Sequence, residues 1–117
     1  MNDKTDGQNA PMFKVHLVVG LVKGKGKPTR GYYRQIELPF VPQVGMKFEQ
    51  GVSTTMWETR DGELNPSIEE VIYDLDEEVI VCLFTVSEEL HASCWKELQN
   101  PTNDNYKCAE LKYFRHR

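Results

Sequence analysis

The chain has 117 residues, of which 39% are hydrophobic and 27% are charged, and its formal net charge is −4. This length fits one domain with its own core, and the composition excludes disorder throughout the chain. No apolar run approaches the roughly 18 residues of a membrane-spanning helix, and residues 1–10 lack the apolar stretch of a secretion signal. We therefore expect a disordered tail at residues 1–11 and one cytoplasmic domain at residues 12–117, without membrane contact.

The first predicted element is a strand over residues 13–22, because apolar side chains occupy every odd position from 13 to 21. Residues 31–40 repeat the period of two and predict a second strand, which forms a hairpin with the first. The connection between them is rich in lysine and glycine and is too long for a two-residue turn. We expect it to project as a basic loop.

The middle of the chain is less regular. Pro39 and Pro42 interrupt sheet pairing, and residues 46–50 and 52–58 predict two further strands. Residues 68–73 and 79–86 predict a second hairpin around the acidic segment 74–78. Residues 79–84 are apolar without a break, which is typical of an internal strand that is covered on both faces of its sheet.

A helix is predicted over residues 87–99, where Leu90, Cys94 and Leu98 recur every four residues behind a cap at Thr85 or Ser87. Residues 106–117 alternate weakly and favour an edge strand, with a short helix as the alternative. The predicted fold is therefore α+β: an antiparallel, twisted or partly closed sheet of five to six strands, with the helix at about 87–99 packed on it. The other face would be covered by curling of the sheet or by a second subunit.

Charge is distributed unevenly along the sequence. Residues 13–60 carry eight cations and three acids, whereas residues 61–95 carry ten carboxylates and no lysine or arginine. Such asymmetry bears on partners rather than on fold, and the acidic segment can complement a basic surface. The alternative interpretation is that the acids are the solvated sides of strands and keep the protein in solution. The acidic candidates for partner binding are Glu69, Glu70, Asp74, Asp76, Glu77 and Glu78.

Two other segments offer contacts. The basic loop could neutralise phosphates through Lys23, Lys25, Lys27 and Arg30, although it lacks the order of a P-loop. Phe40 and Val41 are apolar residues between Pro39 and Pro42, and Trp57 follows further along the chain. If exposed, the candidates for an apolar contact are Phe40, Val41 and Trp57.

The sequence predicts no catalytic residue, no metal and no cofactor. Segment 74–78 lacks the ligand spacing of an EF-hand, and His91 and Cys94 form no recognisable metal or nucleophile motif. Three cysteines without a C-x-x-C pair predict reduced thiols. An enzyme remains the third hypothesis, because active sites assemble from residues that are far apart in sequence.

The leading hypothesis is a non-enzymatic protein-interaction module, of inhibitor, immunity or adaptor type, that binds a protein partner with a basic surface. The alternative is a nucleic-acid-associated protein that binds through the loop at residues 23–31. Self-pairing of strand edges or of the apolar loop would also allow a homodimer.

Overall fold

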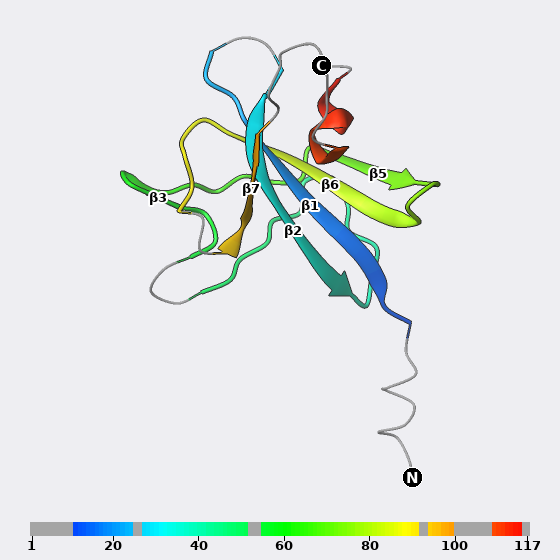
Figure 1. The fold of residues 1–117 in the computed structure, drawn as a ribbon. Coiled ribbons are helices and arrows are strands. Elements are labelled where there is room, and N and C mark those ends of the chain that lie inside the picture. Colours follow the sequence, from blue (N-terminus) through cyan, green and yellow to red (C-terminus); the bar gives the residue numbers. More distant parts are fainter. Residues whose placement is uncertain (1–10, 25–26, 52–54, 92–93, 100–108, 116–117) are drawn as a thin grey trace.

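The computed structural model describes residues 11–24, 27–51, 55–91, 94–99 and 109–115. Within these residues it contains seven strands and one 3-10 helix (Figure 1). The elements are β1 (Phe13–Leu21), β2 (Arg30–Leu38), β3 (Glu58–Thr59), β4 (Gly62–Glu63), β5 (Glu70–Asp74), β6 (Val79–Val86), β7 (Lys96–Gln99) and the 3-10 helix η2 (Ala109–Phe114). The predicted tail lies almost entirely outside the described residues.

Five strands form one mixed sheet in the order β5-β6-β1-β2-β7, and β3 pairs with β4 in a separate hairpin. Both predicted hairpins are confirmed: β1 pairs antiparallel with β2 from Phe13–Leu38 to Leu21–Arg30, and β5 pairs antiparallel with β6. The prediction of a purely antiparallel sheet is wrong, because β1 and β6 are parallel neighbours. A parallel pair requires a crossover, and residues 39–69 supply it.

The sheet has a hydrophobic cluster on each face, because apolar side chains of β6 alternate between the two sides. Ile80, Cys82 and Phe84 pack on the first face, and Val81 and Leu83 pack on the second. β6 is therefore an internal strand that is covered twice, as its unbroken apolar sequence predicted. The first face also holds the odd-numbered apolar residues of β1.

Loops, rather than a helix, cover the first face. Met56, Trp57, Ile68, Leu90 and Trp95 come from the long connections and are buried in the cluster on this face. Both indole N–H groups are satisfied by carbonyl oxygens of the same loops, since Trp57 Nε1 donates to Phe48 O and Trp95 Nε1 to Met56 O, each at 2.7 Å. These bonds fix the loops without regular secondary structure.

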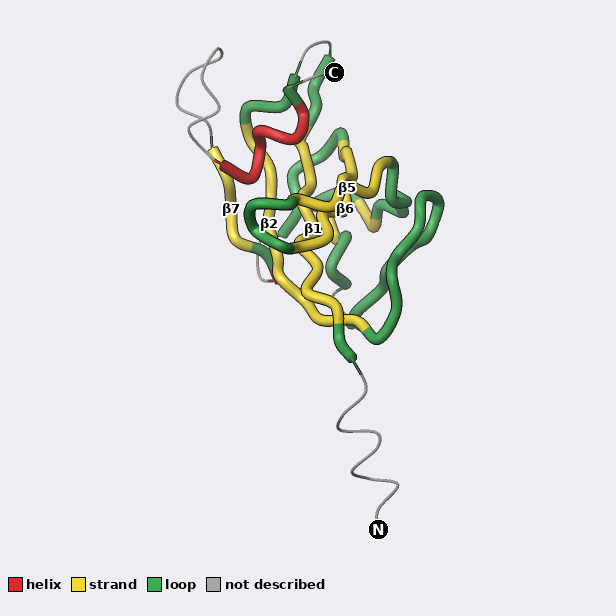
Figure 2. Tube along the Cα trace, turned by 90° about the vertical axis from the view of Figure 1, so that its right-hand side faces the viewer, coloured by secondary structure: helices red, strands yellow, loops and turns green. Residues whose placement is uncertain are grey.

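The second face is covered by η2, whose Leu111 and Phe114 are fully buried against Val18 and Leu83. Figure 2 shows η2 and the long loops on opposite sides of the strands. The favoured edge strand over residues 106–117 is therefore wrong for residues 109–114. Neither sheet curling nor a second subunit is needed to cover this face.

The predicted helix at residues 87–99 is also wrong, so the described part of the chain is all-β and contains no α-helix. The apolar residues of this segment do not share one face: Leu90 and Trp95 join the cluster on the first face, whereas Leu98 joins the other. The backbone N–H of Leu90 donates to Tyr32 Oη at 3.0 Å, and that of His91 donates to Glu58 O at 2.9 Å. Long-range bonds thus take the donors that a helix would use.

The two strands predicted between residues 46 and 58 are not seen in the residues that the structure describes there. Residues 46–50 are irregular, residues 52–54 lie outside the described set, and β3 begins only at Glu58. Backbone bonds nevertheless anchor the segment, because Gly45 N donates to Ile68 O at 2.8 Å and Ile68 N donates to Met46 O at 2.9 Å. The segment therefore runs along residue 68, just before β5.

Candidate functional site

The turn between β5 and β6, residues 74–78, is organised by the carboxylate of Asp74. Its Oδ1 accepts hydrogen bonds from the backbone N–H groups of Asp76 at 2.9 Å and Glu77 at 3.1 Å. Its Oδ2 accepts one from the Tyr113 hydroxyl at 2.6 Å and lies 3.6 Å from Lys112 Nζ. Only 9% of the Asp74 side chain is exposed. Asp74 therefore anchors the turn to η2 and is not available to a partner.

These bonds stabilise the ionised form of Asp74 and lower its pKa from 3.8 to about 2. The hydrogen bond from Tyr113 is the largest cause, followed by the backbone bond from Glu77. The turn ends at Glu78, whose φ of 57° is in the left-handed region that favours glycine. Asp74 and the β5-β6 pairing together hold this residue in that conformation.

A pH series tests this anchor. The ordinary pKa of 3.8 applies in the unfolded chain and about 2 in the folded one, so the unfolded state takes up the proton first. The stabilisation that ionised Asp74 contributes is complete above about pH 5. It is lost as the pH falls from there through the folded-state pKa of about 2. Tyr113→Phe raises the folded-state pKa, so we expect it to destabilise the protein near neutral pH and to converge with the wild type as the pH falls towards about 2.5.

The measurement is urea unfolding followed by circular dichroism from about pH 6 to about pH 2.5. Tyr73→Phe is the matched control, because it removes a hydroxyl from an exposed tyrosine beside the same aspartate. A difference between Tyr113→Phe and wild type that stays constant with pH would show that the hydroxyl does not favour the charged carboxylate.

The tip of the turn presents an apolar side chain among exposed acids. Leu75 is 80% exposed, and Asp76, Glu77 and Glu78 are exposed around it. Among the described residues, the ion pairs involve none of these three carboxylates. Their charges therefore face solvent in the same turn as an exposed apolar side chain.

Other exposed apolar residues gather at the same end of the sheet. β1 begins where β2 ends, and β6 runs parallel to β1, so the segments before β1 and after β2 lie at the end that carries the turn. The exposed large apolar residues at this end are Met12, Phe40, Val41, Tyr73 and Leu75. Val44 is also exposed, but it adjoins Gly45, whose N–H donates to Ile68 O near the opposite end of β5. Trp57 is only 1% exposed and packs in the core, so the structure removes it from the apolar contact candidates.

The six predicted acids thus separate into two groups. Asp76, Glu77 and Glu78 are the solvent-facing carboxylates of the turn, whereas Asp74 is held by η2 and Glu69 accepts a hydrogen bond from the Thr85 hydroxyl. Glu70 begins β5, at the end of the strand away from the turn, and lines a groove of about 710 Å³ between β5 and η2.

The cations of the basic loop that the structure describes all have partners within the protein. Lys23 Nζ and Arg30 Nη2 lie 3.7 and 3.4 Å from the carboxylate of Glu89, and Lys27 Nζ donates to the carbonyl of Arg115. The two cations lower the pKa of Glu89, chiefly through the Arg30 hydrogen bond. Lys25 lies outside the described residues.

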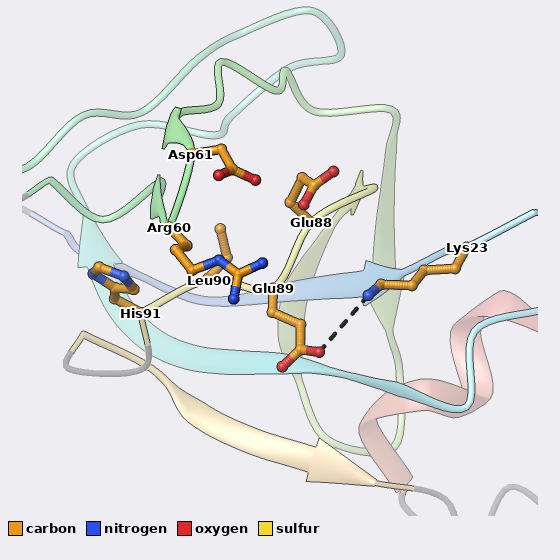
Figure 3. A pocket seen from close by; sticks show the side chains of 7 residues that line it. All are labelled: Lys23, Arg60, Asp61, Glu88, Glu89, Leu90 and His91. Atoms are coloured by element: carbon orange, nitrogen blue, oxygen red, sulfur yellow. Dashed lines mark ion pairs between the residues drawn. The ribbon is translucent and has the colours of Figure 1, made fainter.

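A charged cleft of about 380 Å³ adjoins this loop (Figure 3). Leu90 forms an isolated antiparallel β-bridge with Thr59. This contact brings residues 88–91 against the β3-β4 hairpin, which carries Arg60 and Asp61. The cleft lining is Lys23, Arg60, Asp61, Glu88, Glu89, Leu90 and His91. Because its pKa is lowered, Glu89 remains ionised and is a weak general base, so the cleft offers charged contacts more readily than proton transfer.

The chain matches no protein-family model, and no curated protein or solved structure matches it either. No helix among the described residues is long and apolar enough to cross a membrane.

Sequence reasoning missed three residues that shape these sites: Tyr113, Lys112 and Glu89. Tyr113 and Lys112 fix Asp74 from a segment that is about 40 positions away, and no local pattern points to that contact. The role of Asp74 itself has a sequence signal, because aspartate at the start of a turn commonly accepts backbone N–H groups two or three residues on.

Proposed function

We propose that this protein is a non-enzymatic protein-interaction module that binds a partner with a basic surface through the turn at residues 74–78. The observation that carries the proposal is Leu75, which is 80% exposed in a turn that also carries three exposed carboxylates. An exposed apolar side chain next to exposed charged ones supplies the two parts of a typical interface, an apolar centre and a polar rim. The partner accordingly offers an apolar pocket with a basic border.

The turn is also preorganised for binding. Asp74 holds the backbone of Asp76 and Glu77 and is itself held by Tyr113, so the loop does not have to become ordered when a partner arrives. Less conformational entropy is lost on association with such a loop than with a mobile one. The acids would mainly increase the association rate and the selectivity, and Leu75 would supply the short-range contact.

Nucleic-acid binding through residues 23–31 is less well supported. Glu89 lies against both Lys23 and Arg30, which reduces the positive charge that phosphates would meet. Binding there would first require that these ion pairs be released or shared. An enzymatic role has weaker support still, because Glu89 in the charged cleft is a poor proton acceptor.

The proposal is tested by quantitative capture from lysate, with nuclease-treated and untreated samples run side by side. Three baits are compared: wild type, Asp76→Asn/Glu77→Gln/Glu78→Gln, and Asp61→Asn/Glu63→Gln/Glu88→Gln as a control with the same change of charge. We expect a basic protein whose recovery falls at least tenfold with the turn variant and stays within about twofold with the control, because local charge complementarity decides which surface binds. Leu75→Ala should reduce the same recovery, since it removes the apolar centre without changing charge.

A captured protein that both triple variants lose equally would indicate attraction by net charge alone and would contradict the proposal. Recovery that depends on Lys23 and Arg30 and disappears with nuclease would instead support the nucleic-acid alternative.

A further inference from the structure

The two edges of the sheet differ in chemistry. β7 forms one edge and presents Lys96, Glu97 and Gln99 to solvent, in a strand of four residues. β5 forms the other edge and has the sequence EVIYD, with a continuous apolar centre and Tyr73 55% exposed. Charged side chains, lysine above all, and proline are the usual protection of sheet edges against another strand. β7 carries such charges along its length, whereas the centre of β5 does not.

The outer edge of β5 carries backbone groups without a strand partner. Within the described residues no strand pairs with β5 on the side away from β6. In an antiparallel pair, alternate residues of an edge strand direct their N–H and C=O groups away from the sheet. An added strand would satisfy these groups without any change to the existing sheet.

A groove runs beside this edge on the side of η2. It has a volume of about 710 Å³ and is lined by Glu70, Ile72, Asp74, Asp76, Lys112, Tyr113 and Arg115. Ile72 and Tyr113 both pack against the second-face cluster and give the groove an apolar floor. Glu70 and Asp76 lie towards its two ends along the chain.

Carboxylates outnumber cations in the groove lining, which holds Glu70, Asp74 and Asp76 against Lys112 and Arg115. Lys112 Nζ lies 3.6 Å from Asp74 Oδ2, and Arg115 Nη1 donates to the carbonyl of Lys112 at 2.9 Å. Side chains of an added strand alternate between the faces of the sheet, so every second one would enter this groove. A cation opposite Glu70, an apolar group opposite Ile72 and a second cation two positions further, within reach of the exposed carboxylate of Asp76, would match the groove.

Charge complementarity selects the occupant. A second copy of this chain, added edge to edge, would bring its own acidic hairpin against this one, and like charges on facing strands are destabilising. A basic extended segment gains from the same carboxylates. The edge is therefore better suited to a different, basic chain than to itself.

We propose that β5 is a docking strand, to which the partner adds an extended segment of the pattern basic-x-apolar-x-basic. The inference rests on the proposed function and specifies how the partner is held. Main-chain hydrogen bonds to the edge provide the affinity, and the groove selects the alternating side chains. The turn at residues 74–78 lies at one end of this strand and contacts the same partner.

Two fluorescent peptides of equal charge test the inference: Thr-Lys-Thr-Val-Thr-Lys-Thr and Pro-Lys-Pro-Val-Pro-Lys-Pro. Proline lacks the N–H donor and does not pair within a sheet, so only the threonine peptide can add to β5. We expect it to bind at least tenfold more tightly than the proline peptide in fluorescence anisotropy. Its binding should slow amide exchange in β5 at least tenfold and leave β7 unchanged.

Variants on the two edges supply the matched control. Tyr73→Lys adds one positive charge at the β5 edge, and Gln99→Lys adds the same charge at the β7 edge, where Gln99 is also exposed. We expect Tyr73→Lys to weaken the threonine peptide at least fivefold and Gln99→Lys to change its affinity less than twofold, because lysine obstructs strand addition only where the strand adds.

The outcomes separate the inference from the proposed function. Equal affinity for both peptides, or binding without protection of β5 amides, would overturn the docking strand, while turn-dependent capture of a basic protein would still support the interaction module. Absence of turn-dependent capture, combined with protection of β5 by the threonine peptide, would overturn the turn as recognition point and leave the docking strand supported.

Discussion

Replacing Trp57 by alanine is expected to lower the free energy of unfolding by about 3–5 kcal/mol, the range for large aromatic residues that are removed from a core. Trp57 is 1% exposed, and its ring centroid lies 5.2 Å from that of Phe84 and 5.3 Å from that of Trp95. The substitution therefore leaves a cavity beneath the centre of the sheet. It also removes the donor that satisfies the carbonyl of Phe48.

Trp57→Phe divides this effect into its two causes. Phenylalanine keeps an aromatic ring on Phe84 but cannot donate to Phe48 O, so we expect a loss of about 1–3 kcal/mol. Urea unfolding followed by circular dichroism is the suitable measurement, because tryptophan fluorescence itself changes with the substitution. Leu75→Ala is the exposed control, with an expected effect within about 0.5 kcal/mol. A loss below about 1 kcal/mol for Trp57→Ala would contradict the packing described above.

Gly31→Ala is expected to destabilise the protein by about 3 kcal/mol or more, although alanine ordinarily favours a strand relative to glycine. A Cβ at this position would lie 2.0 Å from the carbonyl oxygen of Val19 and 3.3 Å from Leu111 Cδ2. The first contact is with the backbone of β1, which cannot rotate away. The two central strands would therefore have to separate.

Gly45→Ala serves as the comparison for Gly31→Ala. A Cβ at Gly45 meets nothing within 4 Å, but its φ is +93°, so only backbone strain of about 1–2 kcal/mol is expected. Both variants add one methyl group to a glycine, and urea midpoints measured side by side give the difference. If Gly31→Ala were no more destabilising than Gly45→Ala, the close approach of β1 and β2 would be refuted.

Local patterns were sufficient for the parts of the fold that local contacts determine. The alternation in β1 and β2 and the unbroken apolar run of β6 predicted both hairpins and the internal position of β6, because side-chain period and strand burial are directly related. The acidic turn between β5 and β6 followed from its composition.

The predicted helix failed because spacing alone does not show where each apolar side chain is buried. Leu90 and Leu98 are eight positions apart, as on one helical face, yet they lie on opposite faces of the sheet. The bond from Leu90 N to Tyr32 Oη and the pairing of β7 with β2 decide the local structure. Tertiary contacts of this kind override propensity and are not visible in a single sequence.

The sequence predicted which charged residues form the candidate site, but not which of them are exposed and can contact a partner. Asp74 and Asp76 look alike in sequence, but Tyr113 holds the first while the second faces solvent. Similarly, the exposure of Phe40 and Val41 and the burial of Trp57 depend on how the long connection crosses the sheet.

The parallel pairing of β1 with β6 also determines when the sheet can form during synthesis. Val15 pairs with Ile80, about 65 positions later in the chain, whereas the contacts of β1 with β2 are available early. Until residue 86 has left the ribosome, β1 can pair only with β2, and the edge of β1 that faces β6 in the folded protein has no strand partner. The N-terminal half must therefore wait for β6, and protection of that edge by a chaperone would matter most during this interval.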